Sequence, residues 1–320
     1  MGNYNTNSGY GNFMGDRLMG NTPAVISNGS AVYPTGGKVL MVCPTAHPNF
    51  QVFQQMFGPD PDGANHFFTT LSAALLACTA NRGDVIYVAE GYTETITGAW
   101  GGVPIAGVRV IGLGDGANRP TFTFTTAITA NIPVAVANFT FQNVIFTVGF
   151  DAITALVTVT GADCAFLDCD FNTNNGTMGV VAGLATAATA DRLKVVGCRF
   201  IGPATNSGTT STASIKHEAG VDYQIVNNYF TGKLTQAIVN VATVLRGIIK
   251  DNIFVIATGT AGITMAAAST PFIVNNRFNV ASGTTPIVAA AGFVAGNVYS
   301  AAAGVTSTGG TSAAAAVSTL

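Results

Sequence analysis

The segment Ile225-Val-Asn-Asn-Tyr-Phe230 recurs in variant forms along the second half of the chain. Its other copies are Phe141-Gln-Asn-Val-Ile-Phe146, Phe166-Leu-Asp-Cys-Asp-Phe171, Val195-Val-Gly-Cys-Arg-Phe200, Ile249-Lys-Asp-Asn-Ile-Phe254, Ile273-Val-Asn-Asn-Arg-Phe278 and Val294-Ala-Gly-Asn-Val-Tyr299. The closing aromatic residues of successive copies are 25, 29, 30, 24, 24 and 21 positions apart. A repeat of this period indicates a chain that stacks similar structural units.

The third position of the repeat predicts a sharp corner in the backbone. Only Asn, Asp or Gly occurs there: Asn143, Asp168, Gly197, Asn227, Asp251, Asn275 and Gly296. These are the residue types that enter the left-handed backbone region at least cost. We therefore expect each copy to be two short strands joined by a one-residue corner.

The first, fourth and sixth positions are predicted to point inward. The first is always apolar, and the sixth is Phe146, Phe171, Phe200, Phe230, Phe254, Phe278 or Tyr299. The fourth is Val144, Cys169, Cys198, Asn228, Asn252, Asn276 or Asn297. Coils stacked about 4.8 Å apart would lay ring on ring and amide on amide, which predicts an all-β, single-stranded parallel β-solenoid. The mixed fifth position is expected to face outward, where Asp170 and Arg199 of successive copies are placed to pair.

The composition fits a solenoid and excludes several classes of function. The 320 residues carry a formal net charge of −2, and only 9% are charged, against about 25% in an average globular protein. Like charges stacked on neighbouring strands repel, so a solenoid favours uncharged faces. There is no basic stripe for nucleic acid and no uninterrupted apolar run of the ~18–20 residues that a membrane-spanning helix needs.

Composition divides the chain into four parts. Residues 1–40 form an extended N-terminal arm, 41–83 a lead-in strand and cap helix, 84–300 the parallel β-helix, and 301–320 an Ala/Ser/Thr/Gly-rich tail. The cap helix is expected over residues 66–80, because Phe67, Leu71, Leu75 and Cys78 form one apolar stripe. It would plug the open end of the solenoid. We expect the arm to be held by a neighbouring subunit, and the tail to pack against the solenoid flank or a neighbouring subunit.

Three stretches resemble a known family. Gly83-Asp-Val-Ile-Tyr-Val-Ala-Glu-Gly-Tyr-Thr-Glu94 after a helix, Gly107-Val-Arg-Val-Ile-Gly-Leu-Gly114, and Asn138-Phe-Thr-Phe-Gln-Asn-Val-Ile-Phe146 resemble opening coils of right-handed parallel β-helix proteins of the pectin-lyase-like superfamily. The resemblance covers roughly residues 66–300. With the polar arm and the turn Pro59-Asp-Pro-Asp-Gly63, the layout is most similar to β-helix virion proteins of tailed bacteriophages. The superfamily includes enzymes, adhesins and virion proteins, so the fold alone does not decide the function.

This resemblance implies a non-enzymatic structural component of a bacteriophage virion. The expected form is a homotrimeric capsid decoration or cement protein that stabilises the shell through its arm and solenoid. Its partners would be further copies of itself and the major capsid protein or another virion protein, with no nucleic acid and no membrane. It would be made in the host cytoplasm and lie on the capsid surface. The N-terminus shows no basic region followed by an apolar one, so no secretory signal is expected.

Two alternative functions remain open. A tailspike-like or free β-helix that binds or cleaves polysaccharide, as a lyase or hydrolase, would need a groove with aromatic platforms and at least two close carboxylates. Trp100 is the only Trp available for such a platform. A surface adhesin is the other alternative, and the absence of a secretory signal argues against it.

No catalytic set stands out, and the best charged cluster is Lys216-His217-Glu218 with Asp222 nearby. A His and a Glu facing one groove could serve as base and acid. Neighbours along a strand point to opposite sides, however, so His217 cannot share a face with both flanking residues. The favoured interpretation is a solvated strand on the solenoid surface.

Possible metal and cofactor sites are equally weak. Asp163, Asp168, Asp170 and Asp191 could supply part of a calcium site, but turn chemistry is favoured, because Asp commonly bonds its own turn backbone. Five cysteines, Cys43, Cys78, Cys164, Cys169 and Cys198, cannot all pair internally, and the last three are expected to pack in the core. Gly112-Leu-Gly114-Asp-Gly116 lacks the following helix of a dinucleotide loop. We therefore expect no cofactor and no metal.

Overall fold

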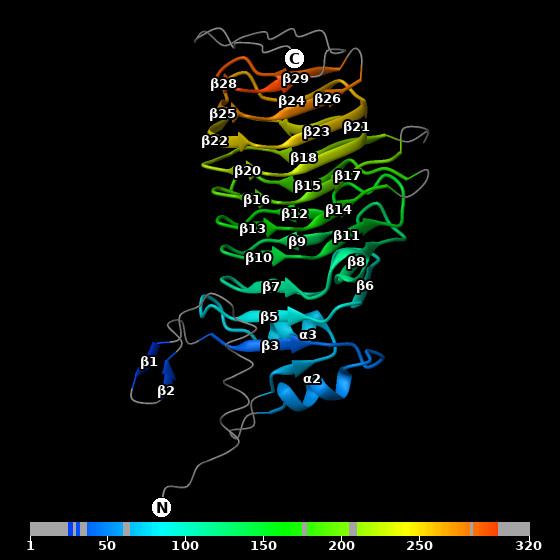
Figure 1. The fold of residues 1–320 in the computed structure, drawn as a ribbon, viewed down its shortest axis with the longest axis vertical. Coiled ribbons are helices and arrows are strands. Elements are labelled where there is room, and N and C mark those ends of the chain that lie inside the picture. The colour runs from blue at the N-terminus through cyan, green and yellow to red at the C-terminus, as the bar shows by residue number, and fades with distance from the viewer. Residues whose placement is uncertain are drawn as a thin grey trace, which may run out of the picture.

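The structure, a computed structural model, describes residues 37–59, 65–174, 178–204, 210–281 and 284–299, and the backbone of two strands before residue 37. The described part is mostly β, and its main body is a parallel β-solenoid of about 10 turns. The strands lie one above another along the long axis, from the N-terminal strands at one end to the C-terminal strands at the other (Figure 1). The solenoid predicted from the repeat is confirmed.

Three stacks of parallel strands form the faces of the solenoid. The first face comprises β4 (Phe67–Phe68), β3 (Val39–Val42), β5 (Val85–Val88), β7 (Arg109–Gly112), β10 (Thr140–Gln142), β13 (Ala165–Leu167), β16 (Lys194–Val196), β20 (Gln224–Val226), β22 (Val244–Lys250), β25 (Thr270–Val274) and β28 (Phe293–Ala295). The short β19 (Gly220–Val221) also pairs with β22.

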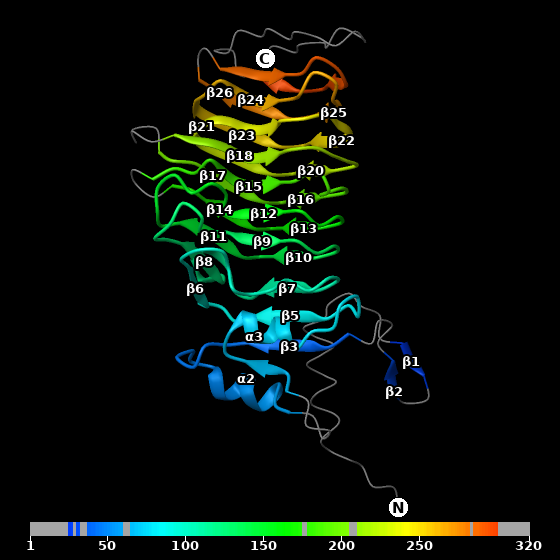
Figure 2. The same cartoon turned by 180° about the vertical axis from the view of Figure 1, so that it is seen from behind.

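The second and third faces are joined where one long strand, β21 (Tyr229–Asn240), runs through both. The second face comprises β6 (Thr93–Ile96), β8 (Thr121–Phe124), β11 (Ile145–Val148), β14 (Asp170–Asn172), β17 (Arg199–Ile201), β21, β23 (Ile253–Thr258), β26 (Arg277–Val280) and β29 (Val298–Tyr299). The third comprises β9 (Ile132–Val134), β12 (Val157–Val159), β15 (Ala182–Thr186), β18 (Ser211–His217), β21, β24 (Ala261–Thr264) and β27 (Thr285–Val288). Figure 2 shows β9, β12, β15 and β18 stacked on the reverse side.

Register between coils follows the sequence repeat. Phe141 pairs with Phe166 across β10 and β13, and Phe146 pairs with Phe171 across β11 and β14. The second register continues through Phe200, Phe230, Phe254, Phe278 and Tyr299. Because a one-residue slip would turn every buried side chain outward, the apolar interior specifies this register strongly.

A single residue turns the chain from the first face to the second in each of these coils. Its φ angle is positive throughout: Asn143 (56°), Asp168 (53°), Gly197 (68°), Asn227 (58°), Asp251 (56°), Asn275 (55°) and Gly296 (64°). The left-handed residue interrupts the strand alternation, so the next residue points into the interior again. This is how the first, fourth and sixth positions of the repeat share the inward side.

The helix predicted over residues 66–80 is shorter in the structure. Only α3 (Leu71–Leu76) is helical, and Phe67–Phe68 forms β4 instead, paired in parallel with β3. Pairing with β3 holds residues 67–68 in a strand, and the Thr70 hydroxyl then accepts a hydrogen bond from the Ala73 N–H and starts the helix. The buried face of α3 joins the interior cluster that contains Leu40, Val42 and Ile86.

A second helix, α2 (Phe50–Met56), was not predicted. Phe50, Phe53 and Phe57 pack with Met41 and Phe67 in a separate apolar cluster. The two clusters use alternate residues of β3, since Leu40 and Val42 belong to the interior cluster and Met41 to this one. Helix α2 therefore covers the outer side of the first face at its N-terminal end.

The proposed arm and tail lie almost entirely outside the described residues. In the arm, the structure gives the backbone of β1 (Val25–Ser27) and β2 (Ser30–Val32), which pair antiparallel. The tail, residues 301–320, lies wholly outside the described residues. In the described part of the chain, no helix is long and apolar enough to cross a membrane.

Candidate functional site

The fourth position of the repeat forms a continuous hydrogen-bonded ladder inside the solenoid. Asn228 Nδ2 donates to Asn252 Oδ1 at 3.0 Å, and the corresponding bonds from Asn252 to Asn276 and from Asn276 to Asn297 measure 2.9 Å. Each Oδ1 also accepts the backbone N–H of the fourth-position residue in the preceding coil. Every ladder amide is thus satisfied although it is buried, as a low-dielectric interior requires.

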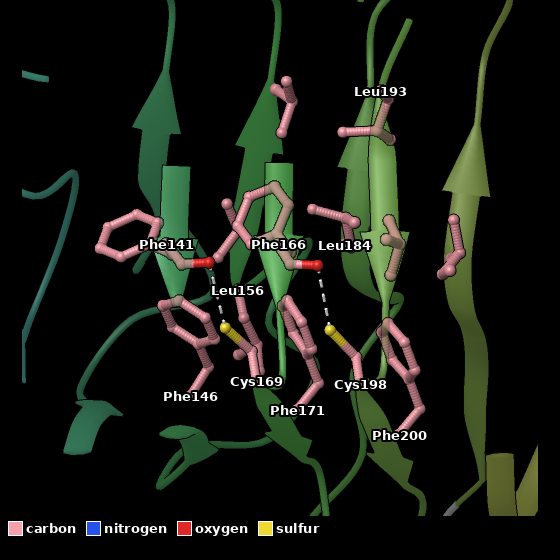
Figure 3. Close-up of a cluster of buried hydrophobic side chains, with 14 of the residues drawn as sticks. Phe141, Phe146, Leu156, Phe166, Cys169, Phe171, Leu184, Leu193, Cys198 and Phe200 are labelled. Carbon is pink, nitrogen blue, oxygen red and sulfur yellow. Dashed lines mark hydrogen bonds between the residues drawn. The ribbon is translucent and has the colours of Figure 1, made fainter. Parts of the chain in front are cut away.

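The second hydrogen of each ladder amide goes to the preceding coil. The Nδ2 atoms of Asn228, Asn252, Asn276 and Asn297 donate to the carbonyl oxygens of Val195, Ile225, Ile249 and Ile273. Cys198 and Cys169 continue this pattern, with the Sγ of Cys198 3.4 Å from Phe166 O and that of Cys169 3.6 Å from Phe141 O (Figure 3). The cysteines therefore occupy the same structural role as the asparagines.

Aromatic rings of the sixth position stack along the same interior. Phe171, Phe200, Phe230, Phe254 and Phe278 follow one another with centroids 4.6 to 4.9 Å apart and nearly parallel planes. Tyr299 ends the stack, 5.3 Å from Phe278. Toward the N-terminal end, Phe146 stacks on Phe171 and Phe166 stacks on Phe141, while rings on different faces meet edge to face. These rings are packed in the core and are not exposed as a platform for a ligand.

The corner column itself lines a shallow polar groove. Its exposed side chains Asn227, Asp251 and Asn275 border a hollow of about 530 Å³, together with Arg277 and Gly296. Asp251 is the single carboxylate of that lining, and it pairs with Lys250 at 3.3 Å. At the other end of the column, Asn143 donates to the carbonyl oxygens of Gly112 and Gly114 and so holds the glycine-rich loop. That loop continues into a three-residue 3₁₀ turn at Gly116–Asn118.

A second corner, which sequence reasoning missed, carries alternating charges. Asp163, Arg192, Asp222 and Arg246 occupy equivalent positions of four successive coils, and all have positive φ. Each lies two residues before a residue of the first-face register formed by Ala165, Lys194, Gln224 and Ile248. Arg192 binds Asp163 through two hydrogen bonds of 2.6 and 2.7 Å, and Arg246 binds Asp222 at 2.7 and 3.0 Å. The arginine partners hold the pKa of both carboxyl groups below the usual value. Arginine in the left-handed region is uncommon, which is why the column was not visible in the sequence.

The four aspartates considered for calcium are thus dispersed. Asp163 pairs with Arg192, Asp168 occupies the other corner, and Asp191 Oδ1 accepts the Val221 N–H. Among the described residues, no group of three or more His, Cys, Asp or Glu side chains could hold a metal ion.

The fourth, Asp170, corrects the prediction that it faces solvent. It is 7% exposed, and its Oδ2 accepts hydrogen bonds from Arg119 Nη2 at 2.5 Å and Arg199 Nη1 at 3.5 Å. Arg119 also donates to the carbonyl oxygens of Gly116 and Asp168. Arg199 is the predicted partner, but Arg119, which directly follows the 3₁₀ turn Gly116–Asn118, lies closer to Asp170. No periodic signal links Arg119 to the repeat.

The Lys216-His217-Glu218 cluster also needs correction. The alternation of sides holds, since Lys216 and Glu218 form a half-exposed ion pair at 3.2 Å. His217, however, is 1% exposed and points into the interior, so this strand is not simply solvated. Its Nδ1 lies 2.5 Å from Thr186 Oγ1, and its ring packs edge to face on Tyr223. His217 therefore cannot act together with Glu218 on an external substrate.

Four of the cysteine residues and the Trp100 ring are buried. Burial raises the pKa of the Cys164 and Cys198 thiols and, reinforced by Glu90, raises that of Cys43 to about 11. Trp100 is buried and donates through Nε1 to Glu94, which also accepts from Tyr92 OH. The Trp100 ring is thus unavailable as a carbohydrate platform.

Asp84, in the stretch of residues 83–94, has a structural role. It is fully buried and accepts hydrogen bonds of 2.7 Å from Lys38 N, Thr79 N and the Arg82 guanidinium. Burial acts to raise the pKa of Asp84, but the bonds from Arg82, Thr79 and Lys38 outweigh it and hold the pKa below the usual value. Asp84 thus joins β3, the turn after α3 and the start of β5.

The geometry defines the class of protein as a parallel β-solenoid whose largely apolar interior contains a ladder of hydrogen-bonded asparagines. Comparison with protein-family models, with curated proteins and with solved structures finds no match to this chain.

Proposed function

We propose that this chain is a non-enzymatic structural component of a bacteriophage virion, acting as a homotrimeric capsid decoration protein. The observation that carries the proposal is that the polar and reactive side chains of the solenoid bond to other groups of the same chain. The ladder asparagines, the inward cysteines and Asp84 all bond the protein's own backbone or neighbouring side chains. Such a body suits mechanical reinforcement, and the resemblance to phage β-helix proteins suggests the setting.

Finer features of the fold belong to this proposal. We take the winding to be right-handed, because connections between parallel strands of one sheet are right-handed in about 98% of cases. We also take α3 to cap the N-terminal end, since Leu71, Ala74 and Leu75 pack on interior residues there. Both features agree with membership of the pectin-lyase-like superfamily, which is part of the proposal.

An exposed apolar patch near the C-terminal end supports self-association. Phe272 and Phe293 lie on neighbouring first-face strands, 49% and 45% exposed, with ring centroids 5.9 Å apart. Both faces of an all-parallel sheet are normally covered. In the proposed trimer, a further copy of this chain would cover the patch formed by Phe272 and Phe293.

Mass in solution and location on particles test the proposal. Light scattering should give three times the 32.5 kDa chain mass, and purified virions should contain the protein on the shell. The double variant F272S/F293S should lower the measured mass, whereas V103S, at an exposed apolar residue outside the patch, should not. A monomeric protein that is absent from virions would refute the proposal.

The polar groove at the corner column favours one second candidate, a polysaccharide-binding β-helix. Its lining of Asn227, Asp251, Asn275 and Arg277 offers donors and acceptors to sugar hydroxyls. Glycoside hydrolysis ordinarily needs two carboxyl groups, so binding without cleavage is the form this groove supports. Incubation with acidic polysaccharides, with and without calcium, tests for binding and for products.

A further inference from the structure

The interior of the third face contains a polar column that the asparagine ladder does not explain. Thr186, His217, Asn240 and Met265 occupy the same position of four successive coils. Tyr223 reaches the column from the turn before β20 and receives a hydrogen bond of 3.2 Å from Asn240 Nδ2. Asn240 Nδ2 also lies 3.0 Å from Met265 Sδ. All of these side chains are buried.

Hydrogen-bond directions define the state of the His217 ring. Thr186 Oγ1 accepts the Glu218 N–H at 3.2 Å, and His217 Nδ1, 2.5 Å away, is the acceptor that the described contacts offer to the hydrogen of the Thr186 hydroxyl. We therefore assign that hydrogen to the bond with Nδ1. Nδ1 is then an acceptor, and the neutral ring carries its hydrogen on Nε2. Within the described residues, His217 Nε2 and Asn240 Oδ1 both lack a hydrogen-bond partner.

We propose that His217 is an acid-sensitive element of the solenoid, whose protonation loosens the contacts among β15, β18 and β21. A proton on Nδ1 would reverse the bond from Thr186 and leave the hydroxyl hydrogen without its acceptor. It would also place a positive charge in the interior between two coils, where an uncompensated charge is costly. The proposal does not depend on the proposed virion function.

The groups around the ring agree with this assignment. Tyr223 faces the His217 ring from the turn before β20. Asp191 lies near the same ring, beside Gly220, and Glu218 is the next residue along the chain. Burial lowers the pKa of His217 from 6.5 to about 4, although Asp191 and Glu218 act in the opposite direction. Asp191 is already engaged by the Val221 N–H.

The sign of the pH effect follows from linkage. The unfolded chain binds a proton at His217 below a pH of about 6.5, whereas the folded chain does so only near pH 4. The folding equilibrium constant should therefore fall as the pH drops from 6.5 to 4. The part due to His217 is on the order of a hundredfold between pH 7 and pH 4.5.

The test compares unfolding of the wild type, His217→Gln and Lys216→Gln in urea at pH 7 and pH 4.5. Carboxyl groups other than Glu218 keep their partners in all three proteins. Lys216→Gln removes the ion-pair partner of Glu218 and so shows how much that pair, rather than the ring, contributes. Over this range the folding equilibrium constant of the wild type and of Lys216→Gln should fall by a factor on the order of a hundred larger than that of His217→Gln. An equal loss in all three proteins would overturn the proposal.

A spectroscopic measurement keeps the proposal falsifiable if His217→Gln does not fold. The chain has three histidines, and ¹⁵N shifts of the folded wild type distinguish the two ring nitrogens. His217 should show an unprotonated Nδ1 and no titration above pH 5. A hydrogen on Nδ1 at pH 7, or a midpoint near 6.5, would contradict the assignment.

Discussion

Asn252 lies over Asn276 in the next coil, and the Nδ2 of Asn252 donates to the Oδ1 of Asn276 over 2.9 Å. The same Oδ1 accepts the Asn252 backbone N–H at 3.0 Å. The Asn276 Oδ1 thus satisfies two donors of the preceding coil. The Asn276 Nδ2 in turn donates to Ile249 O in the preceding coil and to Asn297 Oδ1 in the next. The ladder converts buried polar groups, which would otherwise destabilise a core, into links between coils.

Replacing Asn252 with Ala should lower the free energy of unfolding by about 3–5 kcal/mol, because it leaves several buried donors and acceptors unpaired. Asn252→Cys should lose less, since Cys198 makes the equivalent bond to a carbonyl oxygen in its coil. Urea unfolding measures both. The exposed neighbour Arg277→Ala serves as control and should change stability by less than about 0.5 kcal/mol. Equal effects of N252A and R277A would contradict the role of the ladder.

Replacing Phe254 with Ala should cost about 3–5 kcal/mol, since it opens a cavity within the ring stack. The Phe254 ring lies 4.8 Å from that of Phe230 and 4.6 Å from that of Phe278. Thermal unfolding provides the measurement, with the exposed Ile253→Ala as its matched neighbour. A double-mutant cycle of Phe230 and Phe254 should show coupling, because contacting residues are not additive. Additive losses would mean that the rings do not support one another.

Asp84→Asn should cost about 2–4 kcal/mol at pH 7, because it removes the charge that faces the Arg82 guanidinium. The folded pKa of Asp84 is depressed, so its contribution is present above the unfolded value of about 3.8 and is lost as the pH falls through the lower folded value. The stability curves of wild type and D84N should therefore converge in acid. Thermal unfolding between pH 7 and pH 2.5 tests this, with the exposed Asp115→Asn as control. A constant gap between the curves would show that the charge of Asp84 is not what stabilises the turn.

The charged corner should contribute little, and only at low salt. Arg246→Ala and Asp222→Ala should each lower Tm by about 2 °C or less, since the pair is solvent-exposed. Their coupling in a double-mutant cycle should vanish in 1 M salt, where the Debye length is about 3 Å. Coupling that persists at high salt would indicate that the bidentate geometry, rather than the charge, holds the corner.

The repeat predicted the solenoid because each coil is shaped by the same residue types at the same positions of a short segment. Asn, Asp and Gly at the third position enter the left-handed region cheaply, and the inward residues recur with them. Asp170 and His217 could not be placed this way. Arg119 reaches Asp170 from a loop 51 residues away in sequence, and the inward direction of His217 depends on where β18 ends relative to its neighbours.

The N-terminal end was harder to predict for a different reason. The apolar stripe of residues 66–80 is compatible with a helix, but pairing with β3 converts Phe67–Phe68 to a strand. Helix α2 had a usable signal in the spacing of Phe50, Phe53 and Phe57, which suits one helical face. The residues that helix α2 packs against, however, lie on the outer side of β3 and β4, and the sequence of a strand alone does not indicate that a helix will cover that side.

Hydrogen exchange of the asparagine side-chain amides tests the central claim most directly. The ladder residues Asn228, Asn252 and Asn276 are buried, and the corner residues Asn227 and Asn275 beside them are exposed, so each protein molecule carries its own control. NMR on ¹⁵N-asparagine-labelled protein should show the ladder amides exchanging far more slowly than the corner amides. Equally rapid exchange in both sets would contradict a stack of coils joined through its asparagines.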